Sequence, residues 1–146
     1  MRPRAYAAIE LLLDLVYIAQ TLTGLDLEST MICFCVAEAT ARPVIEAIAH
    51  EPALRTIAQP PEERRGAISR LLIADRTGLP RETVRRKVKA LVERGWLLED
   101  SRRRVRIVAN LADPATQKTA HDTFAAVRRY NQRLRGLGVA GIGEDD

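Results

Sequence analysis

The sequence predicts a mainly α-helical fold with one small β-hairpin. The first observation is an apolar stripe at helical spacing in residues 80–94, with basic side chains on the opposite arc. The second is a pair of short segments, 96–98 and 105–108, rich in aromatic and β-branched residues and joined by a polar stretch. The third is helical periodicity before and after these elements. Extra helices are therefore expected at both ends of the chain, around a helix–turn–helix–hairpin unit.

A tight turn at residues 78–80 separates the two central helices. Gly78 follows the first helix, where a glycine can adopt the positive φ of a helix C-cap. Leu79 is expected to lie between the helices, and Pro80 to open the second helix, where its missing N–H has no helical partner. The apolar stripe of this second helix consists of Val84, Val88, Leu91 and Val92. These features predict a helix-turn-helix, a motif that exposes its second helix to the DNA major groove.

The tip of the predicted hairpin spans residues 99–104 and contains three consecutive arginines, Arg102, Arg103 and Arg104. A basic hairpin tip suits a phosphate backbone or a minor groove. The alternative is a solvated charge run, which is the commoner fate of such runs. The position directly after a helix-turn-helix favours contact with DNA, so we interpret the hairpin as the wing of a winged helix-turn-helix.

The formal net charge of +4 conceals an uneven distribution. Residues 1–63 carry a net charge of −5, residues 64–106 carry +9, and residues 107–146 are neutral. A basic block confined to the helix-turn-helix and wing indicates a nucleic-acid-binding surface. The acidic N-terminal part would be repelled by DNA and is expected to face away from it.

Residues 68–86 resemble the DNA-binding domain of the cyclic-AMP receptor protein family. The resemblance rests on a Ser-Arg pair at residues 69–70 and on the run Gly-Leu-Pro-Arg-Glu-Thr-Val-Arg-Arg at residues 78–86. It implies that Arg81, Glu82 and Arg86 read the bases of a GTGA-like half-site. Pro80 departs from the family pattern, which has a serine there. No counterpart of that family's nucleotide-binding barrel precedes the motif, and the overall layout is similar to small regulators of the multiple-antibiotic-resistance (MarR) type.

The other polar side chains of the unit are expected to contact the DNA backbone. The resemblance implies this role for Ser69, Arg70 and Thr83. Exposed cations form charge-assisted hydrogen bonds with phosphate, which adds Arg85, Lys89 and the three wing arginines. The expected partner is double-stranded DNA and the expected function is sequence-specific regulation of transcription. A protein-interaction module and a non-specific nucleic-acid binder remain alternatives, although the basic helix and wing argue against the former.

The chain divides by pattern into four parts. Residues 1–60 are expected to form a helical region for packing or dimerisation, 61–110 the winged unit, 111–135 a C-terminal helix opened by Pro114, and 136–146 a flexible tail. Within the first part, residues 4–23 and 31–41 read as helices, and Pro43 is expected to start a separate short one. The stripe of the first helix consists of Ile9, Leu12, Leu13, Val16 and Ala19. We expect a homodimer through the terminal helices, with a monomer as the alternative.

Other chemistry finds little support in the sequence. Cys33 and Cys35 point to different helix faces, and His50 and His121 are isolated, so neither a metal site nor an enzyme is predicted and no cofactor is expected. The apolar run at residues 11–19 is interrupted by Asp14 and is too short to span a bilayer, so no membrane segment and a cytoplasmic location are expected. Aromatic side chains could line a pocket for a small effector, although core packing is their commoner role: Tyr6, Tyr17, Trp96.

Overall fold

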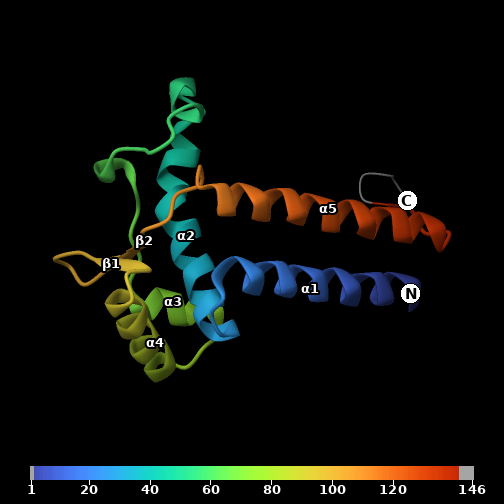
Figure 1. Cartoon of the computed structure of the whole chain (residues 1–146), viewed down its shortest axis with the longest axis horizontal. Coiled ribbons are helices and arrows are strands. Elements are labelled where there is room, and N and C mark those ends of the chain that lie inside the picture. The colour runs from blue at the N-terminus through green and yellow to red at the C-terminus, as the bar shows by residue number, and fades with distance from the viewer. Residues whose placement is uncertain (1, 142–146) are drawn as a thin grey trace. The chain divides into compact units, whose positions relative to one another are not determined.

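The structure, a computed structural model, describes residues 2–141. It contains two compact units: residues 25–113, and the N-terminal residues up to 24 together with the residues from 114 onward. The second of these contains α1 (Arg2–Thr23) and α5 (Pro114–Gly136). The first contains the remaining elements: α2 (Leu27–Ala47), the 3₁₀ turns η1 (Pro52–Arg55) and η2 (Glu62–Arg64), α3 (Arg70–Thr77), α4 (Arg81–Glu93), β1 (Leu97–Glu99) and β2 (Val105–Ile107) (Figure 1). The predicted fold class, mainly helical with a hairpin after a helix-turn-helix, is confirmed.

The core of the winged unit includes α2, which the sequence had assigned to a separate N-terminal region ending at residue 60. Ile32 and Val36 of α2 are fully buried together with Ile73 of α3 and Val84 and Val88 of α4. A two-helix motif with a short hairpin has too little apolar surface to form a core by itself. The third helix that completes this core is therefore α2, and the compact unit begins at Leu25.

The expected break at Pro43 is wrong, because α2 continues through this residue to Ala47. A proline has no N–H to donate to the carbonyl four residues earlier, here that of Ala39. This side of the helix is covered by Gly66: a Cβ built on Gly66 would lie 2.2 Å from the Ala39 carbonyl oxygen. The Gly66 N–H donates to the next carbonyl, that of Thr40, at 2.9 Å. The chain at Gly66 thus packs closely against α2 beside Pro43 and is hydrogen-bonded to it at Thr40.

The turn of the helix-turn-helix follows the sequence closely. Ser69 caps α3 by accepting a hydrogen bond from the Leu72 N–H at 3.2 Å. Gly78 ends α3 in the left-handed conformation with φ of 72°, as predicted. Pro80 has extended ψ and lies immediately before α4, which begins at Arg81, so the proline precedes the helix instead of forming its first residue. Leu79 packs partly buried against the core.

The wing is a two-stranded antiparallel sheet in which Leu98 is paired with Arg106 and Glu99 with Val105. Val105 also exchanges backbone hydrogen bonds with Ile68, just before α3, at 2.9 Å in each direction. A buried hydroxyl fixes the hairpin to α2: Thr40 Oγ1 accepts a hydrogen bond from the Ile107 N–H at 3.1 Å. The strands are therefore held to the helical core at two points.

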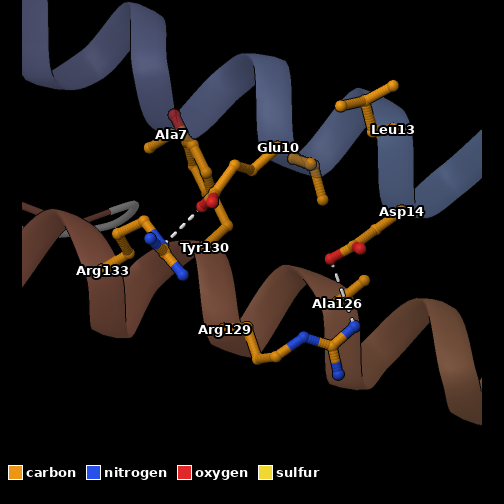
Figure 2. A pocket seen from close by; sticks show the side chains of 9 residues that line it. Ala7, Glu10, Leu13, Asp14, Ala126, Arg129, Tyr130 and Arg133 are labelled. Carbon is orange, nitrogen blue, oxygen red and sulfur yellow. Dashed lines mark hydrogen bonds and ion pairs between the residues drawn. The ribbon is translucent and has the colours of Figure 1, made fainter.

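Helices α1 and α5 form an antiparallel pair (Figure 1). Small side chains allow their close approach, since Ala7 and Ala126 are almost completely buried. Ion pairs join Glu10 to Arg133 at 2.6 Å and Asp14 to Arg129 at 3.2 Å. Figure 2 shows these pairs along a groove of about 320 Å³ between the two helices. The helix at Pro114–Gly136 confirms the predicted C-terminal helix; of the predicted tail, residues 142–146 lie outside the described part of the chain.

Most of the apolar stripe predicted for the first helix lies away from α5, although Leu13 lies at the edge of the groove between the two helices. Ile9, Leu12, Leu13 and Val16 are between 39% and 66% exposed, and Tyr17 beside them is 72% exposed. Large apolar side chains normally lie in a helix interface, but the residues buried most completely in this pair include the alanines Ala7 and Ala126. The stripe is thus an unpartnered surface of this unit.

Helix α1 extends well beyond the apolar run singled out at residues 11–19. The helix of 22 residues is the one described helix that is long and apolar enough, by length and composition alone, to cross a membrane. At 1.5 Å per residue it extends about 33 Å. Its two acidic residues, Glu10 and Asp14, are both paired with arginines of α5.

Candidate DNA interface

The outward face of α4 is strongly basic. Val84 and Val88 are fully buried and Leu91 nearly so, which fixes the rotation of the helix. The opposite face is therefore exposed and carries four cations: Arg81, Arg85, Arg86 and Lys89. The structure thus brings the predicted base-reading arginines and two of the predicted backbone contacts onto one exposed helix face.

Glu82 on this face is already held by a neighbour. Its Oε2 accepts a hydrogen bond from Arg85 Nε at 2.9 Å. This contact holds the pKa of Glu82 below its ordinary value, so the carboxylate is charged at neutral pH. Glu82 therefore holds the guanidinium of Arg85 in place on this face.

The inner side of α4 is fixed by an ion pair that the sequence did not suggest. Lys87 Nζ lies 2.7 Å from Asp26 Oδ2 and 3.4 Å from Glu28 Oε2, both at the start of α2. Asp26 is also the N-cap of α2 and accepts a hydrogen bond from the Ser29 N–H. These hydrogen bonds, that from Lys87 foremost, hold the pKa of Asp26 well below its usual range. Lys87 therefore joins α4 to the start of α2 by an ion pair and is not part of the exposed basic face.

The wing tip is organised by Asp100. Its Oδ1 accepts hydrogen bonds from the backbone N–H groups of Arg102 and Arg104, both at 2.9 Å. These bonds, led by that from Arg104, hold the pKa of Asp100 below its ordinary value. Arg103 between them has a φ of 61° and is 83% exposed at its side chain. Sequence reasoning singled out the arginines and missed the aspartate, although aspartate is a frequent turn former for this reason.

Arg70 was expected at the DNA backbone, but both arms of its guanidinium are directed to the wing. Nη2 lies 2.6 Å from Glu99 Oε2 in β1, and Nη1 donates to the carbonyl oxygen of Arg103 at 2.8 Å. The side chain is 22% exposed. A planar guanidinium that spans a carboxylate and a carbonyl is held in one orientation. The structure thus places Arg70 between α3 and the wing tip.

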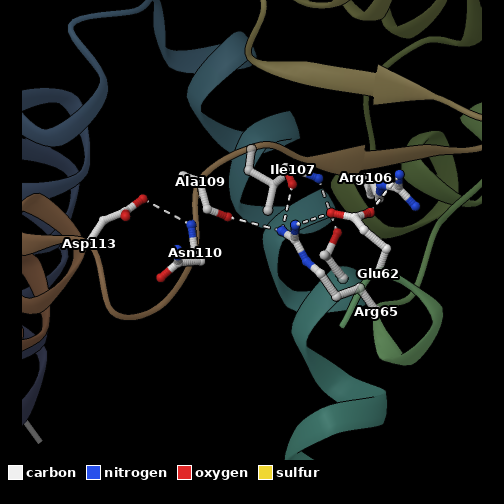
Figure 3. A network of polar contacts seen from close by, with 8 residues as sticks. Glu62, Arg65, Arg106, Ile107, Ala109, Asn110 and Asp113 are labelled. Atoms are coloured by element: carbon white, nitrogen blue, oxygen red, sulfur yellow. Dashed lines mark hydrogen bonds and ion pairs between the residues drawn. The ribbon is translucent and has the colours of Figure 1, made fainter. Parts of the chain in front are cut away.

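A second arginine supports the far end of the wing. Arg65, whose side chain is only 6% exposed, donates to the carbonyl oxygens of Ile107 at 2.7 Å and Ala109 at 3.2 Å. Glu62 lies 2.6 Å from Arg106 of β2 and 3.4 Å from Arg65, as Figure 3 shows. Sequence reasoning missed this network because Glu62 and Arg65 lie more than forty residues before Arg106 in the chain. It fixes where β2 ends.

The two hydroxyl residues expected at the DNA backbone lie near the starts of α3 and α4. Ser69 is the N-cap of α3 and Thr83 is half-buried on α4.

Burial raises the pKa of the Cys33 thiol to about 11 and also raises that of Cys35, so neither is a reactive thiolate at neutral pH. Among residues 2–141, no group of three or more His, Cys, Asp and Glu side chains is arranged to hold a metal ion.

The comparison with protein families agrees with this geometry. Residues 54–101, about a third of the chain, match the IclR helix-turn-helix domain. The matched segment extends from η1 to the wing tip and includes all of α3 and α4. It defines a helix-turn-helix DNA-binding domain of the kind found in transcriptional regulators. The match does not extend to the finer resemblance to the cyclic-AMP receptor protein family or to the MarR-type layout. Neither the curated proteins nor the solved structures contain a match to this chain.

Proposed function

We propose that this chain is a sequence-specific regulator of transcription that inserts α4 into the major groove of double-stranded DNA. The observation that carries the proposal is the exposed basic face of α4 next to a wing with an arginine-rich tip, on a fold that matches a helix-turn-helix domain. Arg81 and Arg86 would donate to guanine O6 and N7, and Glu82 would accept from cytosine N4.

The wing would contact the flanking backbone or the minor groove. Arg102 and Arg103 are exposed at the tip, and Arg104 is tied to Asp100 by its Nε at 3.2 Å. Arg85 and Lys89 flank the base-reading side chains on α4, and Ser69 and Thr83 offer hydroxyl groups near the helix starts. Such contacts set affinity and salt dependence without reading sequence.

Selection of bound duplexes from a random library, at two salt concentrations, tests this function. We expect enrichment of a motif with GTGA-like arms at both concentrations. Binding without an enriched motif that disappears at high salt would show a non-specific binder. Absence of binding at low salt would favour a protein-interaction module and reject the proposal.

We also propose that two copies bind DNA together, joined through the exposed stripe of α1. A solvent-exposed row of large apolar side chains on a two-helix unit is rare in a monomer, and a second copy would bury it against an identical row. The acidic residues of α1 are neutralised by α5 within one chain. Because α1 packs along α5, which carries many charged side chains that are costly in a bilayer, this arrangement favours a soluble, cytoplasmic protein over a helix that crosses a bilayer. A dimer also suits paired half-sites.

A substitution in the stripe tests the dimer. Leu12→Glu places a carboxylate at a 62% exposed apolar position of α1, and we expect it to shift the protein from dimer to monomer in analytical ultracentrifugation. Gln132→Glu, a change at an exposed position of α5 outside the stripe, serves as the control and should leave the dimer intact. A monomeric wild-type protein would contradict the proposal.

A further inference from the structure

Arg70 has a geometry that differs from that of a residue poised to contact DNA. Its two guanidinium arms bridge Glu99 Oε2 at 2.6 Å and the Arg103 carbonyl oxygen at 2.8 Å. The carboxylate of Glu99 also lies 3.7 Å from Arg103 Nε. Three groups of the wing and one of α3 therefore form a single charged cluster, and Arg70 is the only member that comes from a helix.

Among the described residues, the other hydrogen bonds of the wing tip, residues 99–104, are local to the hairpin. Asp100 binds the N–H groups of Arg102 and Arg104, and the Asp100 N–H donates to the Arg104 carbonyl at 2.9 Å. These contacts give the tip its shape, whereas the links from the helical core reach the strand behind it, at Val105 and Ile107, and not the tip itself. The Arg70 bridge supplies such a link between α3 and the tip.

We propose that Arg70 is a positioning residue that aims the wing arginines at DNA, and not itself a phosphate contact. The inference rests on the proposed DNA-binding function. A hairpin held in the bound orientation loses less conformational entropy on binding than a mobile one, so the bridge increases affinity for all sequences. Arg70 acts on DNA through Arg102 and Arg103.

A positioning role and a direct phosphate contact predict different effects of an Arg70 substitution when the wing arginines are absent. If Arg70 acts through the wing, Arg70→Gln raises the Kd for the selected duplex about tenfold, the effect of losing one or two phosphate contacts at moderate salt. In a background that carries Arg102→Ala and Arg103→Ala, the same substitution raises Kd less than about twofold, because the side chains it aims are gone. An equal loss in both backgrounds would overturn the proposal and identify a direct contact.

Two further variants separate charge from geometry. Arg70→Lys keeps the cation but cannot bridge two acceptors with a planar fork, so we expect it to bind like Arg70→Gln; binding like wild type would also contradict the proposal. Arg76→Gln removes the same charge from α3 at a residue paired with Glu38 of α2. We expect it to leave amide exchange at the wing tip unchanged.

A measurement on the free protein distinguishes failure of this inference from failure of the proposed function. In Arg70→Gln, hydrogen exchange at the Asp100 and Arg103 amides, both bonded within the tip, should become about tenfold faster, as expected for a segment that opens more easily. Unchanged exchange would overturn the positioning role. Failure of the wild-type protein to bind any duplex would reject the DNA function itself, whatever the exchange shows.

Discussion

Lys87 of the recognition helix and Asp26 at the start of α2 form an ion pair with an N–O distance of 2.7 Å. Asp26 is also the N-cap of α2. One carboxylate thus both caps the first helix of the winged unit and holds α4, the helix with the exposed basic face. The two consequences can be separated, because an asparagine retains the cap and removes the charge.

The first prediction concerns Asp26→Asn. The depressed pKa of Asp26 in the folded protein means that its charged form stabilises the fold above the unfolded pKa of about 3.9. This contribution is lost as pH falls through the lower folded pKa. We expect the free energy of unfolding of wild type to exceed that of the variant by about 0.5–1 kcal/mol at pH 7, which is the contribution of a partly exposed ion pair. The difference should shrink below about pH 4.

Urea unfolding of both proteins between pH 7 and pH 2.5 measures this difference. Asp75→Asn is the control, since Asp75 is an exposed carboxylate of α3 that forms no ion pair among the described residues. A gap between wild type and Asp26→Asn that stays constant over this pH range would show that the charge of Asp26 is not its cause.

The second prediction concerns Gly66→Ala. The added Cβ would lie 2.2 Å from the Ala39 carbonyl oxygen and 3.2 Å from Pro43 Cγ. Because backbone is the obstacle, the segment must move away from α2, and we expect a loss of about 1–3 kcal/mol, as for other overpacked sites. Thermal unfolding measures it. Gly136→Ala, where a Cβ meets no atom within 4 Å, should be neutral or slightly stabilising, and an equal loss at both positions would refute the steric explanation.

The third prediction concerns Thr40→Val. Thr40 is 2% exposed, and its hydroxyl donates to the Val36 carbonyl at 2.8 Å and accepts from the Ile107 N–H. Valine has nearly the same shape but leaves that buried N–H without an acceptor, which costs about 1–3 kcal/mol. Urea unfolding should detect the loss. Thr21→Val removes an exposed hydroxyl that donates within α1 and should change stability by less than about 0.5 kcal/mol.

The fourth prediction contrasts Arg86→Ala with Arg103→Ala. If Arg86 reads a base, its removal weakens binding to the selected duplex by about 1–3 kcal/mol and relaxes discrimination at one position. Arg103→Ala should instead weaken binding to every sequence and reduce the slope of log K against log salt by about one. Titrations with a selected and a scrambled duplex at several salt concentrations separate the two effects. Equal losses on both duplexes for Arg86→Ala would reject its base-reading role.

The sequence identified the helix-turn-helix because its signals are local. Gly78 at the end of α3 and the apolar stripe of α4 depend on residues within a few positions of one another. The basic face of α4 follows from the same periodicity, since burial of Val84 and Val88 leaves the opposite arc exposed. The match to a helix-turn-helix domain confirms the class, whereas the roles of individual DNA-facing side chains remain predictions.

Errors arose where distant segments meet. Pro43 reads as a helix break, yet Gly66 covers the interrupted carbonyl and α2 continues. The stripe of α1 does not show by itself which segment it packs against, and within the unit Ala7 and Ala126 are among the buried residues of this helix pair, while the stripe is exposed. A local pattern shows that a face is apolar, but it does not show which other segment will cover that face.

The sequence by itself determined the class of the domain, the turn and the exposed basic helix, because each depends on contacts within one or two helical turns. Only the tertiary structure decided which groups pair with the charged side chains. In the folded chain Lys87 pairs with Asp26, Arg65 with the carbonyl at the end of β2, and Arg70 with Glu99 of the wing. An arginine suits a phosphate and a carboxylate equally well, and its partner is set by the folded chain that brings a carboxylate or carbonyl within reach.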